Sequence, residues 1–310
     1  MRAIWIERHG GPEVLELRDL PAPEPGPGEL LVDVTAIGVN YRDVYERTIP
    51  GYAGTLPRVV GVEGAGTVRE VGDRVAWVDA PGSYAEQVVV SAERAVSIPD
   101  GVSDEQATAV LLQGITAHYL SSSTYPVAEG DRVVVHAAAG GVGLLLTQLV
   151  RLRGGRVLAT TSTEEKAELA RAAGAEEVVG YDEFRERAGG LEADVVYDGI
   201  GAATFDASLE ALRPRGTMVL YGAASGQPAP FAPGGLAARS LYLTRPALHH
   251  YTATRAELLE RAGAVLDLVG AGKLEVRIGA RYPLEEARRA HEDLEARRTT
   301  GKLLLIPPPS

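Results

Sequence analysis

The sequence predicts an α/β protein in which a β-rich unit is joined to a doubly wound parallel sheet. Three observations predict this fold class: short apolar runs fill the first hundred residues, strands and helices alternate after Gly101, and a glycine-rich turn links an apolar strand to an apolar helix. Short strands separated by turn residues are typical of a compact β unit. Alternating strands and helices are typical of a parallel sheet with right-handed crossovers.

Six apolar runs near the amino terminus indicate the β-rich unit. They are Ala3–Ile6, Val14–Leu17, Leu30–Ile37, Gly64–Val71, Arg74–Val78 and Tyr84–Val90. Residues 21–28, rich in proline and glycine, lie between two of these runs and have the composition of a flexible linker. We interpret them as a stiff surface loop, because a segment this short is an ordinary loop between strands.

The alternation after Gly101 indicates the parallel sheet. Ser103 is expected to cap the first helix of this region. Ser162 and Glu165 are expected to form a capping box, and Gly174 to end that helix. The expected strands are Arg132–Ala137, Arg156–Thr161, Glu177–Tyr181, Asp194–Tyr197, Thr217–Tyr221 and Leu241–Thr244, and the expected helices are Gly141–Arg153, Thr163–Ala173 and Thr204–Leu212.

The carboxyl-terminal segment returns to a different pattern. Its expected elements are an amphipathic helix from Arg255 to Val269, a strand near Val276, a helix over Leu284–Ala296 and an apolar strand over Lys302–Ile306. The last strand is expected to rejoin the amino-terminal unit. At 310 residues the chain is long enough for two moderate domains, and we predict one from residues 1–112 and 250–310 and another from residues 113–249.

Composition and charge exclude several classes of protein. With 45% hydrophobic residues and mixed charge, the chain is expected to be soluble and globular. No apolar run approaches the ~18–20 residues that span a membrane, and Arg2 to Arg8 has the pattern of a strand rather than a signal peptide, so a cytoplasmic location is expected. A net charge of -11 disfavours general binding to nucleic acid. The absence of cysteine excludes disulfides, thiolate zinc sites and cysteine nucleophiles.

The glycine-rich turn over Ala137–Gly143 predicts a dinucleotide site. In the G-x-G-x-x-G fingerprint the glycines allow a tight turn, a close approach of backbone to pyrophosphate, and close packing of helix on strand. Here Ala138 takes the place of the first glycine, and Gly140 and Gly143 take the other two. The candidate cofactor-binding residues of the turn are Ala139, Gly140, Gly141, Val142 and Gly143.

The end of the second strand favours NADPH over NADH. NAD-binding domains carry an acidic residue about 20 residues after the glycines, where it holds the ribose 2′-hydroxyl. Here the strand ends with hydroxyl side chains that include Thr161 and Ser162, and Lys166 follows one turn later. Hydroxyls and a lysine suit a 2′-phosphate, which a carboxylate would repel. Lys166 taken alone is more typical of a solvated helix charge than of a ligand, and the missing carboxylate is what favours its role as a ligand.

Several motifs together resemble those of a known family. They are Val39-Asn40-Tyr41-Arg-Asp43-Val-Tyr45, Gly61-Val-Glu63-Gly-Ala-Gly66, Leu112-Gln113-Gly-Ile-Thr116-Ala-His-Tyr119, His136-Ala-Ala-Ala-Gly-Gly-Val-Gly143, Val196-Tyr-Asp198 and Tyr242-Leu-Thr244-Arg-Pro246. With these motifs the chain resembles the zinc-independent medium-chain dehydrogenases/reductases of the NADPH:quinone oxidoreductase (zeta-crystallin-like) branch. The resemblance implies a GroES-like catalytic domain and a Rossmann cofactor domain.

The resemblance also implies chemistry without zinc. Zinc-dependent relatives place a histidine directly before the glutamate of the Gly-x-Glu-x-x-Gly segment, and this chain has Val62 there. Without a Lewis acid, the expected acceptor is one that needs little polarisation, such as a quinone or an activated alkene. The six histidines show no metal or triad spacing, and no metal site is expected.

Three residues are implied as the catalytic group of the acceptor site. Asn40, Tyr45 and Tyr52 are expected to line the cleft where nicotinamide meets acceptor. Tyr52 is the candidate proton donor, because related enoyl-thioester reductases have a tyrosine in a similar loop. Each tyrosine could instead be an amphipathic wall residue, and Asn40 a turn residue.

Further cofactor contacts are expected from the resemblance and from the strand ends. Thr116 resembles a family threonine near the nicotinamide ribose or amide, although it could simply bond its own helix backbone. Tyr181 is implied as a neighbour of the 2′-phosphate, and Arg298 to Lys302 either lies near the cofactor or is a solvated basic turn. Ligands bind at the carboxyl ends of such strands, which adds Gly222, Ala223, Ser225, Thr244, Arg245 and Pro246.

These residues support three hypotheses about function. The preferred one is an NADPH-dependent quinone reductase that works mainly by proximity and orientation. The second is reduction of α,β-unsaturated carbonyls or enoyl thioesters, and the third is an NADPH-binding structural or RNA-associated protein of the crystallin type. A homodimer is expected through the sixth strand, Ser240 to Thr244, whose open edge family members cover with a second copy.

Overall fold

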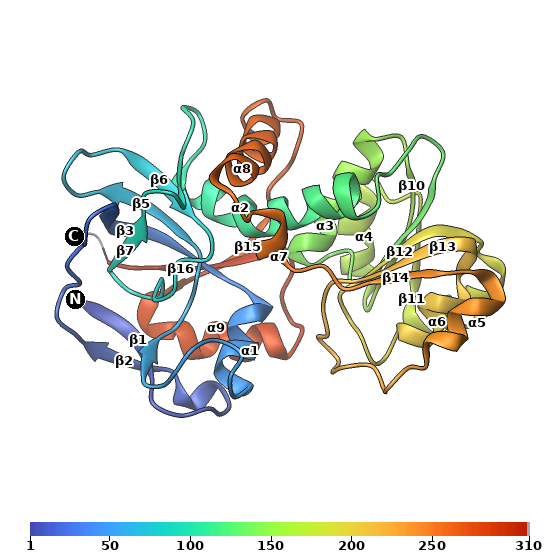
Figure 1. Ribbon diagram of the computed structural model, residues 1–310, viewed down its shortest axis with the longest axis horizontal. Coiled ribbons are helices and arrows are strands. Elements are labelled where there is room, and N and C mark those ends of the chain that lie inside the picture. The colour runs from blue at the N-terminus through green and yellow to red at the C-terminus, as the bar shows by residue number, and fades with distance from the viewer. Residues whose placement is uncertain (309–310) are drawn as a thin grey trace. The chain divides into compact units, whose positions relative to one another are not determined.

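The computed structural model describes residues 1–308 and divides into two compact units. The first unit comprises Met1–Leu112 and Thr252–Ser310, and the second comprises Gln113–Tyr251 (Figure 1). The chain passes from the first unit to the second within helix α2 (Asp104–Tyr119).

The first unit is built on a seven-stranded sheet. Its order is β15-β16-β3-β5-β6-β8, and β7 also pairs with β3. A smaller sheet has the order β2-β1-β4. The strands are β1 (Arg2–Ile6), β2 (Glu16–Asp19), β3 (Glu29–Val39), β4 (Arg58–Val59), β5 (Gly64–Val68), β6 (Arg74–Trp77), β7 (Gln87–Ser91), β8 (Ala95–Ser97), β15 (Ile278–Pro283) and β16 (Lys302–Ile306).

The carboxyl-terminal strand joins the amino-terminal sheet, as the sequence predicts. β16 runs antiparallel to β3, with Leu303 opposite Val39 and Leu305 opposite Ile37. The helices of this unit are α1 (Tyr41–Thr48), α8 (Arg255–Gly270) and α9 (Ala287–Glu295), with 3₁₀ turns η1 (Pro12–Val14) and η5 (Leu284–Glu286). The sheet pairing therefore brings the last strand next to the segment that precedes α1.

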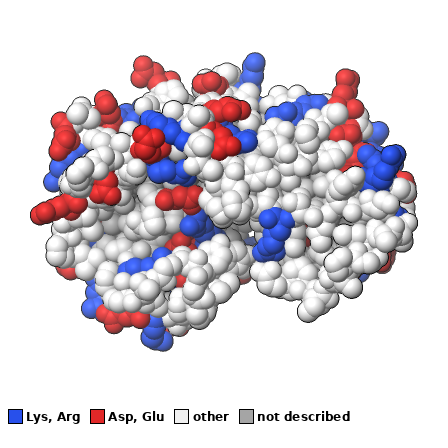
Figure 2. Space-filling model, viewed as in Figure 1, with Lys and Arg blue, Asp and Glu red and all other residues white. Residues whose placement is uncertain are grey.

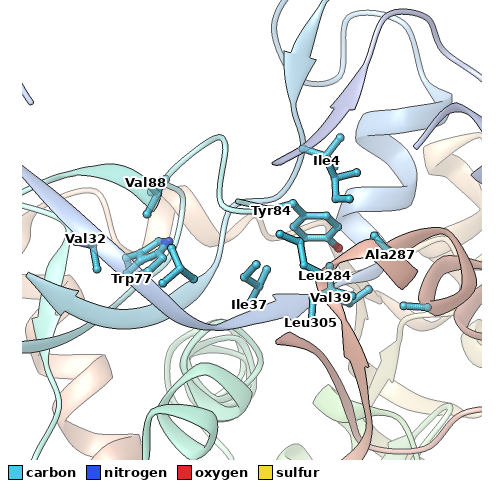
Figure 3. Close-up of a cluster of buried hydrophobic side chains, with 14 of the residues drawn as sticks. Ile4, Val32, Ile37, Val39, Trp77, Tyr84, Val88, Leu284, Ala287 and Leu305 are labelled. Carbon is cyan, nitrogen blue, oxygen red and sulfur yellow. The ribbon is translucent and has the colours of Figure 1, made fainter. Parts of the chain in front are cut away.

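A large aromatic residue lies at the centre of the core of the first unit. Figure 3 shows Tyr84 among Ile4, Val39 and Leu284, all of them buried. A Cβ at Gly61 would lie 2.1 Å from the Tyr84 ring, so only glycine fits beside it. The core thus fixes Tyr84 close to the start of α1.

The second unit is a parallel sheet with helices on its faces. Its strand order is β11-β10-β9-β12-β13-β14, which is the doubly wound arrangement that the sequence predicts. The strands are β9 (Arg132–Val135), β10 (Arg156–Thr161), β11 (Glu177–Gly180), β12 (Ala193–Asp198), β13 (Leu212–Leu220) and β14 (Tyr242–Thr244). The helical elements are η2 (Leu120–Thr124), α3 (Gly141–Leu152), α4 (Glu164–Ala172), α5 (Tyr181–Arg187), η3 (Ala188–Gly190), α6 (Phe205–Glu210), η4 (Pro233–Arg239) and α7 (Leu248–Tyr251).

One of the two predicted helix caps is observed and the other is not. Ser103 caps α2 as expected, because its Oγ accepts the Gln106 N–H at 3.1 Å. The capping box predicted from Ser162 and Glu165 is wrong, since Thr163 is the cap of α4 and accepts the Lys166 N–H at 3.3 Å. Ser162 and Thr163 both carry a hydroxyl group, so the sequence pattern alone could not show which of them caps α4.

Several element boundaries also differ from the prediction. The helix expected over Thr204–Leu212 ends at Glu210, and Leu212 begins β13 instead. Tyr181 begins α5 rather than ending β11. The sequence did not predict α1, because buried charged residues with polar partners, Asp43, Glu46 and Arg47, interrupt its apolar pattern.

Two further features concern the length of the helices and the distribution of charge on the surface. Of the helices within residues 1–308, none combines the length and apolar character needed to cross a membrane. Figure 2 shows acidic and basic side chains interspersed on the face in view.

Candidate cofactor and acceptor sites

The predicted cofactor residues of the second unit gather at one edge of its sheet. β9 lies between β10 and β12, so the strand order reverses there, with β10 and β11 on one side and β12, β13 and β14 on the other. The carboxyl ends of these parallel strands form one edge of the sheet. The residues follow the strand ends in spatial order: Tyr181 after β11; Thr161, Ser162 and Lys166 at and after β10; Ala139, Gly140, Gly141, Val142 and Gly143 after β9; Gly222, Ala223 and Ser225 after β13; Thr244, Arg245 and Pro246 at and after β14. Thr116 lies elsewhere, buried in α2.

The glycine-rich turn brings backbone close to backbone. Ala137 adopts a left-handed conformation, with φ of 51°, and Gly140 precedes the first residue of α3. A Cβ at Gly143 would lie 2.5 Å from the Ala137 carbonyl oxygen and 2.7 Å from the Ala138 Cα. The unpaired N–H groups at the start of α3 suit an anion. The turn therefore fits the pyrophosphate of a dinucleotide.

Hydroxyls and one lysine surround the end of β10. Lys166 Nζ donates to Ser162 Oγ at 3.4 Å, and Ser162 is exposed. Thr161 is buried, and its hydroxyl donates to the Thr163 carbonyl at 3.4 Å. The carboxylate of Glu164, in the first turn of α4, pairs with Arg171 at 2.5 Å. This arrangement can hold a 2′-phosphate on Lys166 and Ser162.

A buried network of side-chain hydrogen bonds, which the sequence did not predict, holds the central strand ends together. His136 Nδ1 lies 2.9 Å from Thr160 Oγ1, and its Nε2 lies 2.9 Å from Ser208 Oγ. Ser208 donates in turn to Asp198 at 3.1 Å, and Asp198 accepts the Ile200 N–H at 2.7 Å. Burial lowers the pKa of His136, which favours the neutral form of its ring. His136 is thus a structural residue, as expected, and joins β9 to β10 and α6.

The turn after β13 uses its polar side chain internally. Ser225 Oγ donates to the Ile200 carbonyl at 2.8 Å and accepts the Ala203 N–H at 3.0 Å. A Cβ at Gly222 would lie 2.6 Å from the Gly199 carbonyl. The Ser225 side chain therefore ties two loops together, and this turn presents mainly backbone to a ligand.

In the first unit, the predicted catalytic residues all lie at or near α1. Asn40 immediately precedes the helix, and Tyr45 lies within it. The Tyr45 ring makes an edge-to-face contact with Tyr52, with 5.6 Å between centroids, and a similar contact with Tyr41 at 5.4 Å. Tyr52 is 47% exposed. The three tyrosines form a row of ring contacts from the first residue of α1 to the segment that follows the helix.

The side chain of Asn40 is held by a buried ion pair. Its Oδ1 accepts from Lys302 Nζ at 2.7 Å, and its Nδ2 donates to Glu63 Oε2 at 2.8 Å. Lys302 and Glu63 pair directly at 2.5 Å, and their side chains are 1% and 0% exposed. Glu63 Oε1 also accepts the Leu112 N–H at 2.7 Å. Both ends of the Asn40 amide are therefore engaged within the protein.

A second buried group, the Asp43 carboxylate, fixes the start of α1. Asp43 Oδ2 accepts the Asn40 N–H and the Tyr84 hydroxyl, each at 2.8 Å. The Tyr84 oxygen lies 3.1 Å from His291 Nε2. Burial, together with the nearby Glu46 carboxylate, raises the pKa of Asp43 to about 7. Burial lowers the pKa of His291 to about 3.

The residues present do not fit a zinc ion. Val62, in the place of the zinc-ligating histidine, is buried at 1% exposure, and the sequence contains no cysteine. Within residues 1–308 there is no group of three or more His, Asp or Glu side chains arranged to hold a metal. The donor set that zinc requires is therefore lacking in the described part of the chain.

Comparisons with known proteins point to one group of enzymes. Residues 26–100 match the alcohol dehydrogenase GroES-like domain, and residues 173–305 match a family model described as zinc-binding dehydrogenase. The chain is 42% identical to a quinone oxidoreductase of Pseudomonas aeruginosa, over 99% of both chains. It is 39% identical to a 2-haloacrylate reductase of a Burkholderia species, over 98% of both. A mycobacterial protein solved with NADPH is 47% identical over 99% of this chain and 100% of its own, with a TM-score of 0.95.

Proposed function

We propose that the chain, which belongs to the quinone oxidoreductase family of the medium-chain dehydrogenases/reductases, is an NADPH-dependent quinone reductase. The observation that carries the proposal is the glycine-rich turn at the centre of the parallel sheet, where added Cβ atoms would strike backbone. It is supported by a relative named quinone oxidoreductase and by a similar structure that contains NADPH.

Each group of residues has a distinct part in the proposed reaction. The turn over Ala139–Gly143 holds the pyrophosphate, and Ser162 and Lys166 receive the 2′-phosphate. Bound NADPH supplies a hydride. The segment with Asn40, Tyr45 and Tyr52 orients the acceptor. Since a reduced quinone oxygen can take its proton from water, the protein contributes mainly proximity and orientation.

We also propose that no zinc takes part in the reaction. Buried Val62 and the lack of cysteine support this proposal, because they remove a histidine ligand and the cysteine ligands that zinc-dependent relatives use. Activity that survives treatment with a strong chelator, with no zinc in the purified protein by elemental analysis, is the expected result. Zinc bound in proportion to protein would contradict it.

A panel of acceptors tests the function directly. NADPH oxidation is measured with 1,4-benzoquinone and 1,2-naphthoquinone, and NADH is tested in parallel. We expect turnover with at least one quinone and a preference for NADPH, because the end of β10 offers hydroxyls and a lysine. No NADPH oxidation with either quinone would overturn the proposal.

Reduction of an activated alkene is the second candidate, and one comparison favours it. A 2-haloacrylate reductase matches almost the whole chain. Adding 2-haloacrylate and simple enones to the same panel separates the two functions. Faster turnover of the alkenes than of the quinones would replace the first proposal by the second.

The assembly and location remain proposals from the sequence. β14 is the edge strand of its sheet, and Tyr242 and Leu243 on it are 62% and 38% exposed. We propose that a second copy covers this edge in a homodimer located in the cytoplasm. A monomeric mass by light scattering at micromolar concentration would contradict the dimer.

A further inference from the structure

Gly141 is a glycine that neither the dinucleotide fingerprint nor its own backbone explains. The fingerprint positions are Ala138, Gly140 and Gly143. The φ of Gly141 is not positive, so its backbone conformation does not require glycine. A Cβ at Gly141 would lie 1.9 Å from Gln113 Oε1 and 2.5 Å from its Nε2. The Gln113 carboxamide therefore lies directly on the Gly141 Cα, at the first residue of α3. Both residues belong to the second unit.

The carboxamide oxygen of Gln113 has no hydrogen-bond partner. Oε1 is buried from solvent, and no donor within the described residues reaches it. Buried polar atoms are rarely left unpaired, because the loss of water costs free energy that only another hydrogen bond restores. The oxygen lies beside the turn that we propose for the cofactor, so the donor it lacks is expected on a bound molecule.

The chemistry of a dinucleotide limits which group can supply that donor. Phosphate oxygens only accept at neutral pH, whereas ribose hydroxyls both donate and accept, so a hydroxyl satisfies either end of a carboxamide. The adenosine ribose of a dinucleotide is expected at the end of the second strand of such a sheet. In this chain that place is the Thr161–Lys166 segment, which leaves the nicotinamide half of the dinucleotide for Gln113. Of the groups in that half, a ribose hydroxyl suits either end of the Gln113 carboxamide.

We propose that Gln113 is a cofactor-binding residue whose carboxamide hydrogen-bonds a hydroxyl of the nicotinamide ribose, and that Gly141 is a glycine because Gln113 occupies the space of its side chain. The proposal rests on the proposed use of NADPH. It assigns a role to the first residue of the second unit and explains a small residue by a contact between α2 and α3.

Gln113→Met tests the proposal, because methionine keeps the length of the side chain and removes both polar ends. We expect the Kd for NADPH, measured by fluorescence titration, to rise about tenfold, as for the loss of one hydrogen bond in a closed site. The Kd for adenosine 2′,5′-bisphosphate, which lacks the nicotinamide ribose, should not change. The free energy of unfolding without ligand should stay the same or rise, because an unpaired buried oxygen is removed. Gln148→Met, on the next helix, is the matched control and should change none of these values.

A double-mutant cycle tests the contact with Gly141. The methyl group of Gly141→Ala would displace the Gln113 carboxamide, so this variant should lose about as much NADPH affinity as Gln113→Met. In the double variant the losses should not add, because both changes remove one contact. Additive losses would overturn the explanation of Gly141.

The other outcomes separate the two proposals. A wild-type protein that binds no NADPH would overturn the proposed function itself. Normal NADPH binding by Gln113→Met would overturn the role of Gln113 alone. Equal losses for NADPH and the bisphosphate, or a lower stability with unchanged affinity, would show a structural effect and would also overturn it.

Discussion

The two candidate sites differ in what holds them together: backbone contacts in the second unit and buried side chains in the first. The cofactor edge of the second unit consists of strand ends and one tight turn, in which backbone packs closely on backbone at Gly143. The Asn40 segment of the first unit is held by buried side chains, and its partner Lys302 is 262 residues away in the sequence. A site made of backbone is sensitive to added volume. A site held by buried charges is sensitive to their balance.

Lys302→Met should have the largest effect on stability, because it leaves the Glu63 carboxylate buried without its cation. Removing one partner of a buried ion pair costs about 3–5 kcal/mol. We expect a loss of this size in the free energy of unfolding by urea, with the Asn40 amide released. Lys273→Met changes an exposed lysine and is the control, with an expected change below about 0.5 kcal/mol.

A second variant decides whether charge balance is the cause. Glu63→Gln introduced into Lys302→Met neutralises the remaining carboxylate and keeps its shape, so at least half of the lost stability should return. If the double variant is less stable than the single one, the side chains act through packing, and the contrast between the two sites is wrong.

Gly143→Ala tests the site made of backbone. Its Cβ would strike backbone atoms of Ala137 and Ala138, which cannot rotate away as a side chain does. The turn must open, and we expect the Kd for NADPH to rise about 100-fold, equivalent to about 2.8 kcal/mol. A Cβ at Gly189 would meet nothing within 4 Å, so Gly189→Ala is the control. Unchanged binding by Gly143→Ala would remove the turn from the cofactor site.

The same difference explains what the sequence could predict. In the second unit, strand ends and the glycine pattern are local features, so most candidate residues along one sheet edge could be identified from the sequence alone, whereas Tyr181 came from the family resemblance. Ala137 is an exception, because nothing in the pattern indicates its positive φ. In the first unit Asn40 was identified by resemblance, but its contacts with Lys302 and Glu63 depend on the pairing of β16 with β3. A contact between distant segments leaves no local signal.

The pH dependence of stability should report the interior of the first unit. Burial lowers the pKa of His291 to about 3, below its ordinary value. Below about pH 6.5 the unfolded state therefore binds more protons than the folded state, and the free energy of unfolding decreases as the pH falls. Between pH 7 and pH 5 the wild type should lose about 2 kcal/mol relative to His291→Gln, which does not titrate. Parallel stability curves for the two proteins, measured by urea denaturation, would show that His291 is charged in the folded state.

The smallest effect is expected at Tyr52, on the exposed side of the first unit's site. Tyr52→Phe removes only the hydroxyl and keeps the ring contact with Tyr45. Since water can protonate a reduced quinone oxygen, kcat with 1,4-benzoquinone should change by less than about twofold. An alkene instead needs a proton at carbon, so a large loss with enones alone would identify Tyr52 as an acid and favour alkene reduction. A tenfold loss with quinones as well would mean that the acceptor site, like the buried network around Asn40, depends on one particular side chain.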